Sequence, residues 1–203
     1  MKKHAIRIVG GQYRRTPIPV PDVAGLRPTP DRVRETLFNW LAHFWGNDFS
    51  GKRVLDLFAG TGALGFEAAS RGVEYVQMVE SDPTAVAALR AMRNHLRADS
   101  VRIHAGDALH VLERLRSQVF DLVMLDPPFR QNGLDRLWKP VQTILAPDSL
   151  VYAESEAPLV PMPPFTPLRQ GKAGHVHFYL LRFDAMQKTD NNPVFCCMNS
   201  APD

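Results

Sequence analysis

The chain of 203 residues is long enough for one domain with its own hydrophobic core. Apolar residues make up 45% and charged residues 22%, an ordinary globular balance, and no apolar run approaches membrane-spanning length. The only two cysteines, Cys196 and Cys197, are adjacent, which excludes a disulfide framework, and the first residues lack the apolar segment of a signal peptide. We therefore expect a cytoplasmic protein without a membrane partner.

Charge is distributed unevenly along the chain. The whole sequence has 24 basic and 21 acidic residues, a net charge of +3, but residues 1–40 hold eight basic residues against three acidic ones. A basic N-terminal arm on a nearly neutral body favours a polyanionic partner, and a solvated charged terminus would give the same pattern.

The first elements in chain order are a strand-like segment at 5–11 and a helix within 27–46. Thr29 can cap this helix, Pro30 suits its first position, and Gly46 can end it. Apolar residues recur at helical spacing between Val33 and Phe44, so one face of the helix is expected to be buried.

From residue 52 onward, short apolar runs alternate with helical stretches. This pattern predicts a mostly parallel, doubly wound α/β sheet. Strands are expected at 53–60, 75–80, 101–107, 120–126 and 149–156, with helices at 61–72, 83–98, 108–117 and 134–145 between them. The last two strands, 166–170 and 175–183, are joined by the short sequence GKAG and should form an antiparallel hairpin.

Ligands of open parallel sheets bind beyond the carboxyl ends of the strands, so the residues that close each strand indicate the site. After the first of these strands, Gly60, Gly62 and Gly65 form G-x-G-x-x-G at the start of a helix, where free N–H groups and the absence of side chains admit a ligand. Glu80 closes the second strand and can accept hydrogen bonds from ribose hydroxyls, and Asp107 closes the third and can accept from a nucleobase amine. Three such strand ends predict a nucleoside site.

Asp56 separates two classes of nucleoside cofactor. A carboxylate just before the glycines would repel a pyrophosphate and attract the amino group of a sulfonium amino acid, which favours S-adenosylmethionine over a dinucleotide. The residues expected to bind this cofactor are Asp56, Phe58, Ala59, Gly60, Thr61, Gly62, Glu80, Ser81, Asp107 and Ala108.

The fourth strand ends in the sequence Asp126-Pro127-Pro128-Phe129, at the same rim. The Asp126 carboxylate and the Pro127 carbonyl could each accept a hydrogen from an exocyclic amine, which would aim the nitrogen lone pair at a methyl donor. The prolines would hold these acceptors still, and Phe129 would stack on the base drawn into the site. We predict these four residues as the catalytic set.

The motifs RIVGGQYR, LRPTPDRVRETLFNWL, VLDLFAGTGALGFEAASRG, DPPF and YAESE resemble the RsmD family of bacterial ribosomal RNA methyltransferases. The resemblance covers about residues 5–183. It implies a Rossmann-like class I methyltransferase that transfers a methyl group from S-adenosylmethionine, leaving S-adenosylhomocysteine, to the N2 amine of a guanine in small-subunit ribosomal RNA. The implied partner is ribosomal RNA within a small-subunit particle.

Three further classes of activity are compatible with parts of the pattern. An adenine-N6 methyltransferase would use the same DPPF chemistry, an oxidoreductase would use the glycine motif, and a non-catalytic RNA-binding module could keep the fold. The absence of a separate target-recognition domain counts against a DNA enzyme, and Asp56 with DPPF counts against an oxidoreductase.

Basic residues of the N-terminal region are the expected phosphate contacts. They are Arg7, Arg14, Arg15, Arg27, Arg32 and Arg34. For Arg32 and Arg34, pairing with Asp31 or Glu35, or reaching a cofactor carboxylate, are open alternatives.

The expected organisation is a basic extension at 1–50, a methyltransferase domain at 51–183 and a disordered tail at 184–203. We expect a monomer without a metal, because the histidines are scattered and lack partners at metal-ligand spacing.

Overall fold

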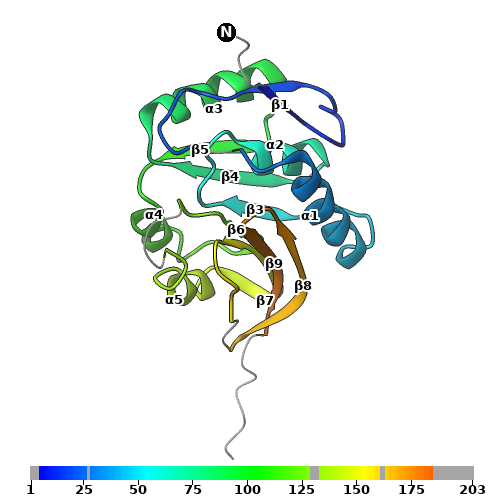
Figure 1. Ribbon diagram of the computed structural model, residues 1–203, viewed down its shortest axis with the longest axis vertical. Helices are drawn as coiled ribbons and strands as arrows, with labels where there is room; N and C mark the ends of the chain where they lie inside the picture. The colour runs from blue at the N-terminus through cyan, green and yellow to red at the C-terminus, as the bar shows by residue number, and fades with distance from the viewer. Residues whose placement is uncertain (1–4, 27, 129–132, 161–162, 185–203) are drawn as a thin grey trace, which may run out of the picture.

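The computed structural model describes residues 5–26, 28–128, 133–160 and 163–184 (Figure 1). Arg27, Phe129 and all but the first residue of the expected tail therefore lie outside the described residues. Within the described part of the chain, no helix has both the length and the apolar composition needed to cross a membrane.

A seven-stranded sheet forms the centre of the molecule, in the order β5-β4-β3-β6-β7-β9-β8. The first five of these strands run parallel, and β9 pairs antiparallel with both β7 and β8. The strand bounds are β3 Arg53–Asp56, β4 Tyr75–Glu80, β5 Val101–Ala105, β6 Phe120–Leu125, β7 Leu145–Ser155, β8 Phe165–Ala173 and β9 Val176–Phe183. The predicted fold class is confirmed.

The chain changes direction across the sheet at β3. It builds outward from β3 to β4 and β5, then returns to the other side of β3 to add β6 and β7. Such a switch point opens a crevice at the carboxyl ends of the two central strands, which are β3 and β6 here.

Helices cover both faces of the sheet (Figure 1). Alternate residues of each strand point to opposite faces, so Val54 packs with one core and Leu55 with the other. The first core includes buried side chains of α1, α2 and α3, and the second includes those of α4 and α5. The helix bounds are α1 Asp31–Phe44, α2 Ala63–Ser70, α3 Pro83–Leu96, α4 Ala108–Arg114 and α5 Trp138–Gln142.

Residues before α1 form a separate two-stranded antiparallel sheet of β1 (Ala5–Arg7) and β2 (Pro17–Pro19). The second of these strands was not predicted, because two of its three residues are prolines, which strands in sheet interiors avoid. An edge of a two-stranded sheet tolerates them.

The C-terminal hairpin is present, but its loop is shorter than expected. Ala173 pairs with Val176, so Gly171, Lys172 and Ala173 belong to β8, and only Gly174 and His175 make the turn. Gly174 has a φ of 60°, a left-handed conformation that glycine adopts without strain. The predicted loop at 171–174 is therefore wrong in position, although the antiparallel pairing is confirmed.

Candidate active site

The glycine motif forms a tight loop between β3 and α2. Gly62 caps α2 in a left-handed conformation with a φ of 80°, and a Cβ there would come within 2.6 Å of the Phe66 ring. Gly65 lies in the first turn of α2, where a Cβ would come within 2.4 Å of Met78 Cε on β4. Gly65 therefore lets the first turn of α2 lie close to β3 and β4, and the N–H groups of this turn face the crevice.

Glu80 connects the glycine loop to the next strand end. Its Oε2 accepts a hydrogen bond from Gly60 N at 2.8 Å, and its Oε1 accepts from Ser81 N at 2.7 Å and Asp82 N at 2.8 Å. A carboxylate has about four acceptor positions, so Oε2 can take one further donor. The predicted ribose-binding residue is thus fixed in orientation beside the loop.

Asp107 caps α4 and is exposed. Its Oδ1 accepts from Leu109 N at 3.0 Å and His110 N at 3.2 Å, the geometry of an N-cap. The following residue, Ala108, is buried. Asp107 lies at the rim after β5, but its capping bonds account for the acid without a ligand.

Asp56 is buried at the end of β3. Its Oδ2 accepts a hydrogen bond from Gly65 N at 3.1 Å, which ties the strand to the start of α2. Burial, followed by the charges of Glu80 and Glu154, raises the pKa of Asp56 to about 7, against bonds from backbone N–H groups that lower it.

Asp126 follows β6 directly and lies at the same rim as the glycine loop. Asp126 is half-buried, and burial together with the charges of Glu154 and Asp56 raises its pKa well above the ordinary value. Pro127 is half-buried and Pro128 exposed, so the corner borders open space. Phe129, the predicted stacking residue, lies outside the described part of the chain.

Glu154 is a site residue that the sequence analysis did not predict. It is buried near the end of β7, its Oε1 accepts a hydrogen bond of 2.6 Å from the hydroxyl of Tyr152, and burial raises its pKa. The motif YAESE pointed to this segment only through a resemblance. The signal that could have found Glu154 is its place at a strand end neighbouring that of Asp126.

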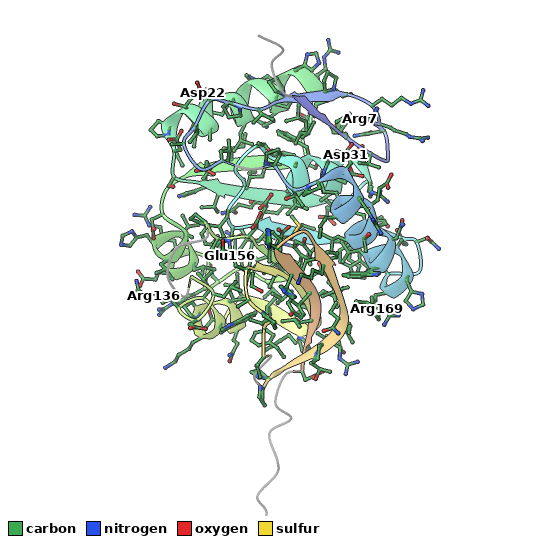
Figure 2. The ribbon with its side chains drawn as sticks, in the orientation of Figure 1. Arg7, Asp22, Asp31, Arg136, Glu156 and Arg169 are labelled. Atoms are coloured by element: carbon green, nitrogen blue, oxygen red, sulfur yellow. The ribbon has the colours of Figure 1, made fainter. Side chains whose placement is uncertain are left out.

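The predicted arginines occupy two different environments. Arg14, Arg15 and Arg32 are exposed, and Arg7 is exposed beside Asp31, with 3.4 Å between Nε and Oδ2 (Figure 2). Arg34 is fully buried: its Nη2 donates to Asp31 Oδ1 at 2.5 Å and to the Arg7 carbonyl at 2.8 Å. Pairing with Asp31 is therefore the alternative that the structure shows for Arg34, and no phosphate can reach its guanidinium in this conformation.

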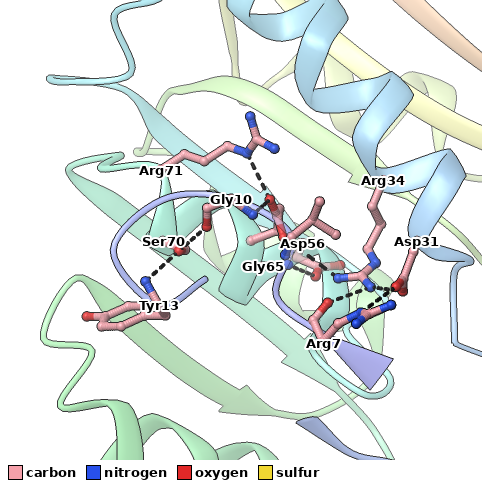
Figure 3. Close-up of polar contacts among 11 residues, drawn as sticks. Arg7, Gly10, Tyr13, Asp31, Arg34, Asp56, Gly65, Ser70 and Arg71 are labelled. Atoms are coloured by element: carbon pink, nitrogen blue, oxygen red, sulfur yellow. Dashed lines mark hydrogen bonds and ion pairs between the residues drawn. The ribbon is translucent and has the colours of Figure 1, made fainter. Parts of the chain in front are cut away.

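Glu67 of α2 holds the N-terminal arm and was not predicted. Its fully buried carboxylate accepts from Val9 N at 2.7 Å and Gly10 N at 2.9 Å, and pairs with Arg71 Nε at 2.9 Å and Arg34 Nη1 at 3.7 Å. Figure 3 shows this cluster around Gly10, Arg34 and Arg71. The arm is thus attached to the same helix that the glycine loop begins.

The glycine pair of the arm fits this contact. Gly11 has a φ of 76°, and a Cβ at that position would lie 1.8 Å from the Ser70 carbonyl oxygen. Ser70 Oγ also donates to the Gly10 carbonyl and accepts from Tyr13 N at 2.9 Å (Figure 3). The motif GGQYR therefore has a structural role in docking the arm onto α2.

Within the described ranges, no group of three or more histidine, cysteine or acidic side chains is arranged to hold a metal ion.

The switch point, the glycine loop and the acidic strand ends together define a class I S-adenosylmethionine-dependent methyltransferase fold. The RNA methyltransferase of Salinibacter ruber, solved in complex with S-adenosyl-L-homocysteine, has this fold at a TM-score of 0.59 and 19% identity, covering 81% of this chain and 98% of that one. At that identity the likeness shows the fold alone.

Family membership is shown by closer relatives. The family model described as Conserved hypothetical protein 95 matches residues 6–182. The chain is 38% identical over 191 residues to the ribosomal RNA small subunit methyltransferase D of Escherichia coli (strain K12), covering 91% of this chain and 93% of that protein. It is 36% identical over 185 residues to the Haemophilus influenzae protein of the same name, covering 88% and 94%.

A solved structure agrees. The yhhF protein of Escherichia coli superposes with a TM-score of 0.77 at 36% identity, covering 90% of this chain and 99% of that one. The chain therefore belongs to the ribosomal RNA small subunit methyltransferase D family, as its motifs predicted.

Proposed function

We propose that the protein transfers a methyl group from S-adenosylmethionine to the exocyclic N2 amine of one guanine in small-subunit ribosomal RNA. The observation that carries this proposal is the position of Asp126 and Pro127, directly after β6 and beside the glycine loop at the switch point. The names of the relatives support ribosomal RNA as the substrate.

The residues present suit the proposed cofactor. Gly60 and Gly62 take positive φ angles in the loop, Glu80 keeps an acceptor position for a ribose hydroxyl, and the acids at the rim favour a cationic ligand. When bound, S-adenosylmethionine supplies an electrophilic methyl group on a sulfonium. Phe58, Ala59, Thr61, Ser81, Asp107 and Ala108 follow the same strand ends and complete the proposed cofactor set.

The corner after β6 would act on the acceptor amine. The exocyclic nitrogen of guanine is a weak nucleophile because its lone pair is delocalised into the ring. If the Asp126 carboxylate and the Pro127 carbonyl each accept one of its hydrogens, the nitrogen becomes pyramidal and its lone pair points along a fixed direction. Pro128 stiffens the corner, and Phe129 is proposed to stack on the base.

The exposed arginines of the arm and of α1 are the proposed RNA contacts. Arg7, Arg14, Arg15 and Arg32 can each reach a phosphate, and Arg27 belongs to the same proposed surface. In this proposal, residues 1–50 form an RNA-binding extension of a catalytic domain at 51–183. The protein would act as a monomer on a small-subunit particle, and a cytoplasmic location follows from that substrate.

The test is to identify the methylated nucleoside. The protein is incubated with methyl-labelled S-adenosylmethionine and, in parallel, unmodified small subunits, naked ribosomal RNA or DNA. Each nucleic acid is then digested and its nucleosides are separated. We expect label in N2-methylguanosine from the small-subunit RNA. Label in N6-methyladenosine, or in DNA alone, would reject the proposal.

A further inference from the structure

Three carboxyl groups lie in a row on one face of the sheet, at the ends of neighbouring strands. Asp56 pairs in register with Met124, and Met124 pairs with Tyr152. Met124 and Tyr152 both belong to the core on the α1–α3 face. Because side chains alternate along a strand, Asp56 of β3, Asp126 after β6 and Glu154 of β7 point to that same face.

Asp126 and Glu154 are direct neighbours in this row. Leu125 pairs with Ala153, so the next residues along the two parallel strands, Asp126 and Glu154, stand opposite each other. The charge of Glu154 acts on Asp126, and after burial it is the largest cause that raises the pKa of Asp126. Carboxyls that lie this close can titrate as a pair.

The side chain of Tyr152 orients the Glu154 carboxyl. The Tyr152 hydroxyl donates to its Oε1 at 2.6 Å, and burial with the Glu154 charge raises the pKa of Tyr152, so the phenol keeps its proton. The Tyr152 ring packs on Phe178 of β9, with 6.5 Å between centroids, and Phe178 stacks on Trp40 of α1 at 5.5 Å. The bond from Tyr152 therefore fixes the orientation of the Glu154 carboxyl.

The titratable groups around the pair come from two strands. Asp56 faces it from β3, and Tyr152 faces it from β7. The elements packed behind them, β9 and α1, contribute Phe178 and Trp40, which do not titrate. Among the residues that the structure describes, no lysine, arginine or histidine forms an ion pair with Asp56, Asp126 or Glu154.

We propose that Glu154 is a positioning residue that shares one proton with Asp126, so that the two carboxyls work as a single acceptor for the proton that the substrate amine releases. This inference rests on the proposed function in one respect, that the substrate is an amine. Glu154 acts through Asp126 and does not touch the base.

Once the amine nitrogen has gained its methyl group, it must lose one proton. An oxygen lone pair of Asp126 forms the new O–H bond, and the N–H bond electrons return to nitrogen. The pair then holds two protons instead of one and loses one to water. No oxidant or reductant takes part.

The first test measures carboxyl titration in the free protein, without cofactor or RNA. Carboxyl 13C chemical shifts are followed against pH in the wild type, in Glu154→Gln and in Asp126→Asn, which assign the two groups. We expect two linked steps in the wild type, separated by more than about one pH unit. Glu154→Gln should lose the upper step and leave Asp126 with a single step at lower pH. An Asp126 titration that is unchanged in Glu154→Gln would overturn the proposal.

The second test follows the single-turnover rate against pH. The wild-type rate should rise through the lower step, where the pair comes to hold a single proton, whereas the rate of Glu154→Gln should rise through the single step of Asp126, with an unchanged KM for RNA. The matched control is Glu156→Gln, an exposed acid two residues further on, which should behave as the wild type. A rate lowered by the same factor at every pH would mean a purely structural role and would overturn the proposal.

The two proposals can fail separately. The carboxyl titration needs no substrate, so its result does not depend on which nucleoside is labelled. If another amine is methylated, the proposed guanine is wrong while the shared proton is retained.

Discussion

Two clusters of buried charge lie within one fold and are built in opposite ways. Glu67 is surrounded by Arg34, Arg71 and two backbone N–H groups, so its negative charge is balanced where it lies. Asp56, Asp126 and Glu154 instead have no basic partner in the described part of the chain, and burial together with the charge of Glu154 raises the pKa of both Asp56 and Asp126. A balanced cluster holds two segments together, whereas an unbalanced one is poised to bind a cation or accept a proton.

The largest effect on stability is expected from Glu67→Gln. It removes the negative partner of two arginines, one of them fully buried, and Arg34 already has two nitrogens without a hydrogen-bond partner among the described residues. Breaking a buried pair on one side typically costs about 3–5 kcal/mol. Denaturant unfolding should show a decrease of this size, and Glu74→Gln, an exposed acid, should show almost none. Equal stability of the two variants would contradict an anchoring role for Glu67.

The opposite effect on stability is expected when a carboxyl of the second cluster is neutralised, as in Asp56→Asn. The pKa of Asp56 is raised to about 7 when folded, so between about pH 4 and 7 the folded protein keeps a proton that the unfolded chain has lost. The free energy of unfolding therefore falls as the pH rises through this window, by up to about 4 kcal/mol for this group.

In Asp56→Asn this part of the pH dependence is absent. Unfolding free energies measured at intervals from pH 4 to pH 8 should decline less steeply in the variant than in the wild type. Parallel profiles for the two proteins would show that Asp56 is not protonated in the folded state at neutral pH.

Smaller effects are expected at the exposed arginines of the arm. Replacing Arg14 or Arg15 with glutamine should weaken RNA binding and reduce the slope of log K against log salt by about one for each phosphate that the variant no longer binds. Stability should be unchanged, because both side chains are exposed. Arg136→Gln is the matched control, since Arg136 is exposed on the α5 side of the molecule, away from Arg7 (Figure 2). The same reduction of slope in this control would assign the effect to net charge rather than to the arm.

The strand ends of the site could be predicted from the sequence because each is local. The glycine motif, Glu80 and Asp126 each follow an apolar run directly, and parallel strands bring their carboxyl ends to one edge. Arg34 could not be placed, because its partners depend on how the arm folds back onto α1 and α2.

Glu67 and Glu154 were missed for the same reason, that their contacts are not local. Glu67 accepts a hydrogen bond from the backbone N–H of Val9, which lies 58 positions away in the chain, so the sequence of the helix does not predict the contact. The environment of Glu154 depends on the register of β7 against β6, which puts it opposite Asp126, and on the hydrogen bond from Tyr152.

The central claim is that Asp126, one of the three carboxyls without a basic partner among the residues that the structure describes, accepts hydrogens of the substrate amine. Its most direct test is single-turnover methyl transfer by Asp126→Asn, with cofactor binding measured on the same preparation. We expect the rate to fall by about 10²–10³-fold, the usual cost of losing one oriented polar group at a reacting centre, with unchanged affinity for S-adenosylmethionine. A variant that transfers methyl groups at the wild-type rate, or that loses cofactor affinity and keeps its rate at saturation, would contradict the account.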